Sequence, residues 1–128
     1  GSGAAGGLAG GLAAIGAQLQ DGFSLIAEEV DLDVHVERAD LVITGEGFLD
    51  AESFDGKVVG GVAELAAAYG VPVVAVVGSV LDEVHDRVET ISLVERFGDE
   101  RAMTDTTACV EEVVAELLSG GGSRAGAR

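Results

Sequence analysis

Residues 73–77, a run of five apolar side chains between Pro72 and Gly78, restrict the fold more than any other segment. An apolar run without polar alternation is typical of a strand that is buried on both faces, as in a parallel sheet. Residues 41–44 and 90–94 are two further strand candidates. Valine-rich runs that alternate with alanine-rich amphipathic stretches predict the α/β class, with a small parallel sheet of about three or more strands flanked by helices.

Helical periodicity predicts the elements between these strands. The large apolar residues of the first twenty positions fall on one face of a helix that also contains several glycines: Leu8, Leu12, Ile15 and Leu19. The same kind of pattern predicts further helices over residues 22–30, 58–69, 81–88 and 105–118. The acidic segment between the second helix and the first strand is expected to be a connection without a helix of its own.

Length and charge limit the domain organisation and the function classes. Residues 1–119 are expected to form a single α/β domain that is part of a larger one, and residues 120–128 a flexible glycine-serine tail. The formal net charge is −16, from 7 basic and 23 acidic residues. This acidic balance makes nucleic acid an unlikely partner, because phosphate backbones require a basic patch.

The cysteine content and the first residues of the chain indicate the cellular compartment in which the protein is expected. Cys109 is the only cysteine, so an internal disulfide is impossible and a reducing cytoplasm fits. No signal-peptide pattern is present. Residues 1–19 carry no charge, but seven of them are glycine, which is a poor composition for a membrane span. We therefore expect a cytoplasmic protein without a membrane partner.

Residues 44–57 form a polar segment between the first predicted strand and the helix that begins near Val58. In an open α/β sheet, such a loop lies at the carboxyl end of a strand, where ligands bind. Glu46, Asp50, Glu52 and Asp55 lie within ten positions of one another. Carboxylates of this density could hold Mg²⁺ together with substrate phosphates, or one of them could act as a general base.

Lys57 and three glycines add the other parts of a phosphate site. Lys57 precedes a helix, where an ammonium group and free backbone amides can meet a phosphate. Gly45, Gly47 and Gly56 permit sharp turns and close approach of a ligand. Together these residues could form a phosphoryl-transfer site, in which positioning and charge neutralisation do most of the chemistry. A solvated acidic turn with an exposed lysine is the alternative that composition leaves open.

The sequence of residues 39–57 resembles the signature of the bacterial glycerate kinase family. Residues 1–8 are similar to the glycine-rich segment of that family, and residues 70–79 to its next strand and loop. The resemblance implies a Rossmann-like domain and transfer of the ATP γ-phosphate to glycerate, with Mg²⁺, to give phosphoglycerate. It covers the C-terminal third of such kinases, whose active site lies in a cleft between two domains.

The resemblance also implies roles for individual residues. Lys57 would bind a phosphate or the glycerate carboxylate, Asp50 would hold Mg²⁺ or act as a base, and Glu46 would orient the loop. A role in binding substrate or phosphate is implied for Gly3, Gly6, Gly45, Gly47, Ser53, Gly56 and Ser79. For Ser79, a helix-capping role is an open alternative.

Two positions depart from the family pattern. Phe48 stands where the family usually has an arginine, and Val59 where it often has a proline. An arginine there could neutralise a phosphate or a carboxylate, and Phe48 cannot. Two main hypotheses follow, beside a third and simpler one in which the chain binds a nucleotide without transferring a group. In the first, the chain is part of a glycerate kinase that is inactive without the missing part. In the second, it is a catalytically lapsed module for binding or assembly. An incomplete sheet also predicts a homodimer or a complex with a chain that supplies the rest.

Overall fold

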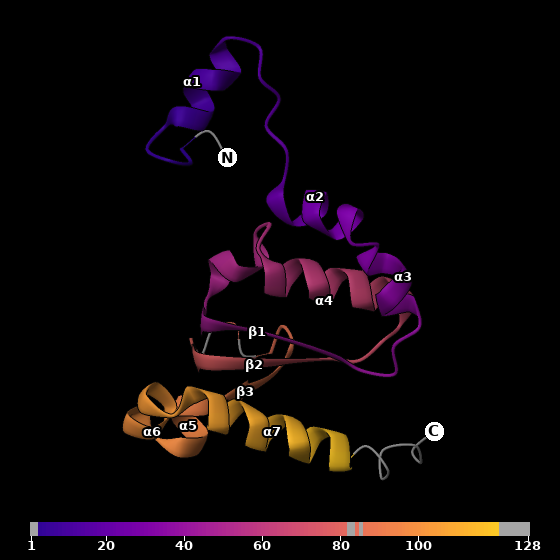
Figure 1. The fold of residues 1–128 in the computed structure, drawn as a ribbon, viewed down its shortest axis with the longest axis vertical. Helices are drawn as coiled ribbons and strands as arrows, with labels where there is room; N and C mark the ends of the chain where they lie inside the picture. Colours follow the sequence, from indigo (N-terminus) through magenta and orange to yellow (C-terminus); the bar gives the residue numbers. More distant parts are fainter. Residues whose placement is uncertain (1–2, 82–83, 85, 121–128) are drawn as a thin grey trace.

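The computed structural model of the chain describes residues 3–81, 84 and 86–120. Its centre is a parallel sheet of three strands in the order β1-β2-β3 (Figure 1). The strands are β1 (Val42–Leu49), β2 (Val73–Val80) and β3 (Glu89–Ser92). The sheet and its flanking helices confirm the predicted α/β class.

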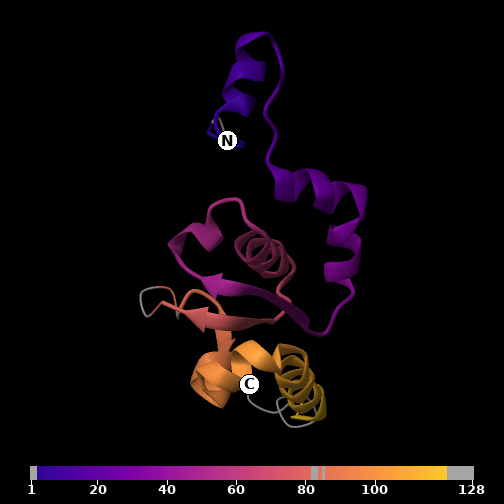
Figure 2. The same cartoon turned by 60° about the vertical axis from the view of Figure 1, so that its left-hand side comes forward.

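Helices cover both faces of this sheet (Figure 1). The helix α4 (Val58–Tyr69) lies on one face of the sheet. The helices α2 (Gly22–Glu29) and α3 (Leu32–Glu37) pack against α4 and lie farther from the sheet. The other face carries three consecutive helices, namely α5 (Leu93–Phe97), α6 (Asp99–Thr104) and α7 (Thr106–Gly120). A first helix, α1 (Leu8–Ala14), stands clear of these layers at the end of an extended segment (Figures 1 and 2).

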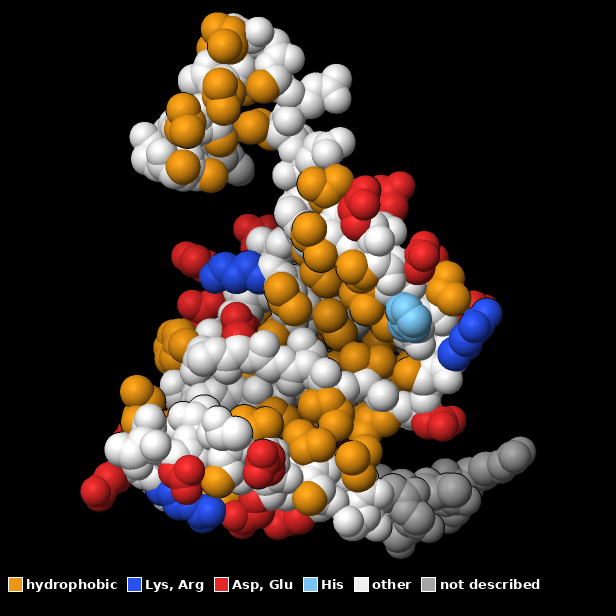
Figure 3. All heavy atoms as spheres, in the orientation of Figure 1, with side chains coloured by type: hydrophobic (Ala, Val, Ile, Leu, Met, Phe, Trp, Pro, Cys, Tyr) orange, Lys and Arg blue, Asp and Glu red, His pale blue; other side chains and the backbone are white. Residues whose placement is uncertain are grey.

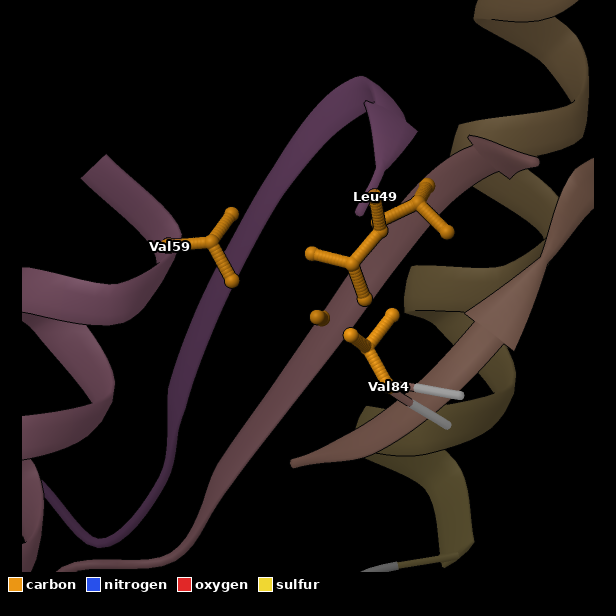
Figure 4. Close-up of a cluster of buried hydrophobic side chains, with 5 residues drawn as sticks. Leu49, Val59 and Val84 are labelled. Atoms are coloured by element: carbon orange, nitrogen blue, oxygen red, sulfur yellow. The ribbon is translucent and has the colours of Figure 1, made fainter. Parts of the chain in front are cut away.

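Two apolar clusters hold the layers together, one on each face of β2. Between the sheet and α4, Leu49 of β1, Val59 of α4 and Val84 converge with Ala75 and Val77 (Figure 4). On the other face the buried residues are Val76, Leu93, Ala102, Cys109 and Val113. Successive residues of β2 therefore enter opposite clusters, as expected for a strand without polar alternation.

Strands β1 and β2 extend further than their sequences predict. The loops predicted to begin after Thr44 and at Gly78 are strand as far as Leu49 and Val80. Glycine makes this pairing possible, because a Cβ atom on Gly45 would collide with the carbonyl oxygen of Val76. A Cβ atom on Gly78 would collide with the carbonyl oxygen of Gly47 in the same way. The two strands thus approach too closely for any larger residue at these positions.

Several helix boundaries also differ from the prediction. The first helix ends at Ala14, so Leu19 lies beyond it. The acidic connection contains α3, in which Val36 is the buried residue. The third strand ends at Ser92, whose hydroxyl oxygen caps α5 by accepting from the backbone N–H of Glu95 at 3.3 Å. Parts of the helix predicted over residues 81–88, and the tail beyond residue 120, lie outside the described residues.

Across the described part of the chain, no helix is both long enough and apolar enough to cross a membrane.

Candidate functional site

A short 3₁₀ helix, η1 (Ala51–Phe54), follows β1 and is closed by a reciprocal cap between Asp50 and Ser53. The backbone N–H of Ser53 donates to Asp50 Oδ1 at 3.0 Å, and the Ser53 hydroxyl donates to the same oxygen at 3.1 Å. The backbone N–H of Asp50 in turn donates to Ser53 Oγ at 3.2 Å. Ser53 is fully buried. These two residues therefore fix the path of the chain as it leaves the sheet.

Lys57 is the residue immediately before α4, at the end of this loop. Its ammonium lies 3.5 Å from Glu52 Oε2, and both side chains are substantially exposed. An exposed ion pair of this kind contributes little to stability, so an incoming anion can replace Glu52 at small cost. Gly56 allows the turn before Lys57 because its φ is +73°, a value that glycine adopts readily.

Glu46 and its two neighbouring glycines line a groove along the middle of β1 and β2. The groove lies on the face covered by α7, and the residues around it include Gly45, Glu46, Gly47, Gly78, Thr106 and Val110. The carboxylate oxygen Oε1 of Glu46 is buried and has no hydrogen-bond partner among the described residues. Buried polar atoms are normally paired, so this oxygen points to a missing partner.

Two residues near these elements were missed by the sequence reasoning. The Arg87 guanidinium carbon lies 4.0 Å from the centroid of the Phe54 ring, a cation–π contact that places positive charge beside η1. Thr106, at the start of α7, lines the groove. A single arginine in an acidic loop and a threonine at the start of a helix are common surface features, so neither residue carries a local sequence signal.

The remaining predicted site residues are spread over the molecule. Ser79 lies in β2 and pairs with Phe48 in β1, and Phe48 is half exposed. Gly3 and Gly6 lie in the turn before α1, which stands away from the sheet (Figure 1). The structure thus places Asp50 and Lys57 in the connection from β1 to α4. Glu46 lies within β1 and lines the groove on the face covered by α7, and the first glycines lie apart from both places.

Asp50 has the chemistry of a Mg²⁺ ligand without forming a complete cage. Among the residues that the structure describes, no three His, Cys, Asp or Glu side chains cluster closely enough to hold a metal ion by themselves. Mg²⁺ in phosphate-transfer sites is usually held by one or two carboxylates, with phosphates and water completing the shell. Asp50 uses Oδ1 in its cap, and in the described part of the chain Oδ2 has no hydrogen bond. Asp50 therefore fits a Mg²⁺ site in which phosphate and water oxygens supply the other ligands.

A parallel sheet covered by helices on both faces defines an α/β protein, the class in which ligands commonly bind at the carboxyl edge of the sheet. Comparison with known families then identifies the family of this protein. The model of the glycerate kinase family matches residues 1–119. The chain belongs to the glycerate kinase family.

Individual relatives agree with this assignment and show its extent. The chain is 44% identical over 85 residues to the glycerate 2-kinase of Escherichia coli K12, covering 66% of this chain and 22% of that protein. It is 48% identical over 80 residues to the glycerate kinase of Halalkalibacterium halodurans, covering 62% of this chain and 21% of the relative. The chain therefore spans about a fifth of the length of these curated relatives.

A solved structure extends the likeness to almost the whole chain. It is described as a glycerate kinase 2 from Salmonella typhimurium LT2, and it is similar with a TM-score of 0.56 and 32% sequence identity. The match covers 97% of this chain and 33% of the Salmonella chain. Two-thirds of that solved chain thus has no counterpart in the structure described here.

Proposed function

We propose that this chain carries one wall of a glycerate kinase site, which transfers the γ-phosphate of ATP to glycerate when the remainder of such a kinase is present. The unpartnered Oε1 of Glu46, buried beside a groove along the middle of β1, is the observation that carries this proposal. A buried polar atom without a hydrogen bond is destabilising by about 1–3 kcal/mol. Such a defect in the motif shared with the family is best explained by a ligand or by a neighbouring chain segment.

Each residue of the loop has a role that its surroundings support. Lys57 binds an anionic group of the substrate, since its ammonium is held near the amino end of α4 by an exposed and replaceable ion pair. Asp50 is fixed by Ser53 and offers its second carboxylate oxygen to a metal ion or to the hydroxyl of the acceptor. Bound ATP with Mg²⁺ would supply the phosphoryl group and neutralise its charge.

Turnover assays with matched lysine and arginine variants test this function. ADP release is measured with glycerate, ATP and Mg²⁺, with the chain alone and with the chain co-expressed with the missing part of a glycerate kinase. Lys57→Ala is expected to lower the rate by about a hundredfold or more, because a charge-neutralising group is lost. Arg38→Ala removes a positive charge at the end of α3 and is expected to leave the rate unchanged. Equal rates for both variants would refute the role of Lys57.

Phe48 favours a second candidate function, a binding or assembly module without catalysis. Its half-exposed ring occupies the position of the family arginine and cannot neutralise an anion. Phe48→Arg separates the two candidates. If the assembled protein turns over only with Phe48→Arg, the natural chain has lost catalysis. If the natural chain already turns over, Arg87 or the missing part supplies the charge.

A further inference from the structure

Positive charge is scarce in this molecule, so the places where it occurs are informative. The formal net charge is −16, and acidic side chains outnumber basic ones on the face shown in Figure 3. The basic residues of the described chain are Arg38, Lys57, Arg87, Arg96 and Arg101. An anionic substrate meets an unfavourable field over most of this surface. Its binding therefore requires cationic side chains that acidic neighbours do not already neutralise.

Most of these basic side chains are paired with acids. Arg96 and Arg101 each form an ion pair with a glutamate of α7, and Lys57 pairs with a glutamate of η1. In the part of the chain that the structure describes, the guanidinium of Arg87 has neither a carboxylate partner nor a hydrogen bond. Arg38 is also without an ion pair there, but it follows α3 and precedes β1, so it lies at the opposite end of that strand from η1.

Arg87 is held against η1 by an aromatic ring. Its guanidinium carbon lies 4.0 Å from the centroid of the Phe54 ring. Phe54 is itself fixed from two further sides, because it packs on the apolar cluster beneath α4, and a Cβ atom on Gly60 would lie 2.5 Å from its Cα atom. A guanidinium that stacks on a ring uses its flat face, and the N–H groups at its edge stay available to planar or tetrahedral oxyanions. The ring thus holds a set of free donors in place.

Lys57 belongs to the same connection as Phe54, from which only Asp55 and Gly56 separate it. An ammonium group in an exposed ion pair and a free guanidinium are therefore held beside one short loop of a strongly acidic chain. We propose that Arg87 is a second anion-binding residue of the candidate site, which donates to a phosphate or carboxylate oxygen of the substrate beside Lys57. The inference rests on the proposed function for the identity of that substrate.

Anion binding can be measured without turnover. The natural chain is titrated with inorganic tripolyphosphate and, separately, with glycerate, by isothermal titration calorimetry at low ionic strength, where surface charges are least screened. We expect saturable binding, and the tighter probe tells whether Arg87 serves the phosphate chain of the nucleotide or the carboxylate of the acceptor. Arg87→Ala should weaken this binding by about fivefold or more, because a charge-assisted hydrogen bond is lost. Arg38→Ala should leave it unchanged.

Two further variants separate the charge of Arg87 from its packing on Phe54, and circular dichroism checks that each variant is folded. Arg87→Met keeps an apolar stem over the ring without the charge, and it should weaken binding as much as Arg87→Ala. Arg87→Lys keeps the charge and should retain more binding than Arg87→Met. Absence of saturable binding by the natural chain, or equal affinities of Arg87→Ala and Arg38→Ala, would overturn the inference. Full binding by Arg87→Met would also overturn it, because Arg87 would then act by packing alone.

Failure of this inference is distinguishable from failure of the proposed function. If the assembled protein turns over and loses its rate in Lys57→Ala, but keeps its KM values for ATP and glycerate in Arg87→Ala, the kinase reaction stands and the role of Arg87 is refuted. If anion binding depends on Arg87 but the assembled protein releases no ADP, the role of Arg87 stands and phosphoryl transfer is refuted.

Discussion

At the scale of single residues, Glu46 is expected to lower the stability of the isolated chain and to serve the proposed function of the assembled protein. Its Oε1 is buried without a partner among the described residues, so the carboxylate is an unfavourable group in the chain alone. Glu46→Gln keeps the shape and removes the charge. We expect it to raise the free energy of unfolding of the isolated chain by about 1 kcal/mol, measured by urea denaturation.

The same variant should behave differently in the assembled protein, where the proposed ligand is present. Its rate of ADP release should fall at least tenfold if Glu46 orients the loop for the reaction. If Glu46→Gln makes the isolated chain less stable, the Glu46 carboxylate already has favourable partners in that chain. This result would remove the main support for the proposed site.

The glycines of β1 offer a matched pair of substitutions. A Cβ atom on Gly45 would collide with the carbonyl oxygen of Val76, whereas one on Gly47 would meet nothing within 4 Å. Gly45→Ala should therefore lower the free energy of unfolding by about 1–3 kcal/mol. Gly47→Ala should change it by less than about 0.5 kcal/mol. Comparable losses in the two variants, by chemical denaturation, would contradict the close pairing of β1 and β2.

At the scale of elements, the start of α2 is fixed by a cap and an aromatic contact. Asp21 Oδ2 accepts from the backbone N–H of Ser24 at 2.7 Å. Phe23 packs so closely on α4 that a Cβ atom on Gly61 would collide with its ring. The hydrogen bond from the Ser24 backbone, followed by that from its side chain, lowers the pKa of Asp21 below the ordinary value of 3.8.

This lowered pKa predicts a pH dependence for the cap. The ionised form is favoured in the folded chain, so the contribution of Asp21 to stability is complete above pH 3.8 and is lost as the pH falls through the lowered folded value. The difference in melting temperature between the natural chain and Asp21→Ala should be largest near neutral pH and vanish well below pH 3.8. Glu29→Ala, at the other end of α2, is the control. A difference that is constant with pH would refute the assignment.

Elements with strong periodicity were predictable from the sequence, and those defined by tertiary contacts were not. The valines of β2 and the apolar face of α4 each carry a local pattern, and the structure has both. The end of β1 was missed because Gly45, Glu46 and Gly47 are poor strand formers, and only close pairing with β2 keeps them extended. No periodic pattern predicts α3, a helix of six residues in which Val36 alone is buried.

The candidate site was predictable to a similar degree. The motif around Asp50 and Lys57 located the loop, and the order of strand, loop and helix placed it at the carboxyl edge. The reciprocal cap with Ser53 and the contact of Arg87 with Phe54 depend on side-chain geometry after the turn. The contact of Arg87 with Phe54 joins residues that are distant in sequence and has no local pattern, so it required the folded chain. The cap spans only three positions, but its side-chain geometry was not expected from the sequence.

At the scale of the whole molecule, the layered body and α1 are nearly independent. Removal of residues 1–20 should leave the thermal midpoint of the body unchanged within a few degrees, because α1 has only marginal contact with other elements. Differential scanning calorimetry of the full and shortened chains measures this. A large decrease would show that α1 packs on the body in solution.

The projecting helix has a further consequence for the lifetime of the protein in a cell. Exposed apolar segments on extended linkers are where proteases cut and chaperones bind. A chain with α1 exposed should therefore be degraded faster than one that lacks residues 1–20, which pulse-chase labelling of the two chains would measure. The lifetime of the protein would then depend on the projecting helix and not on the stability of the layered body.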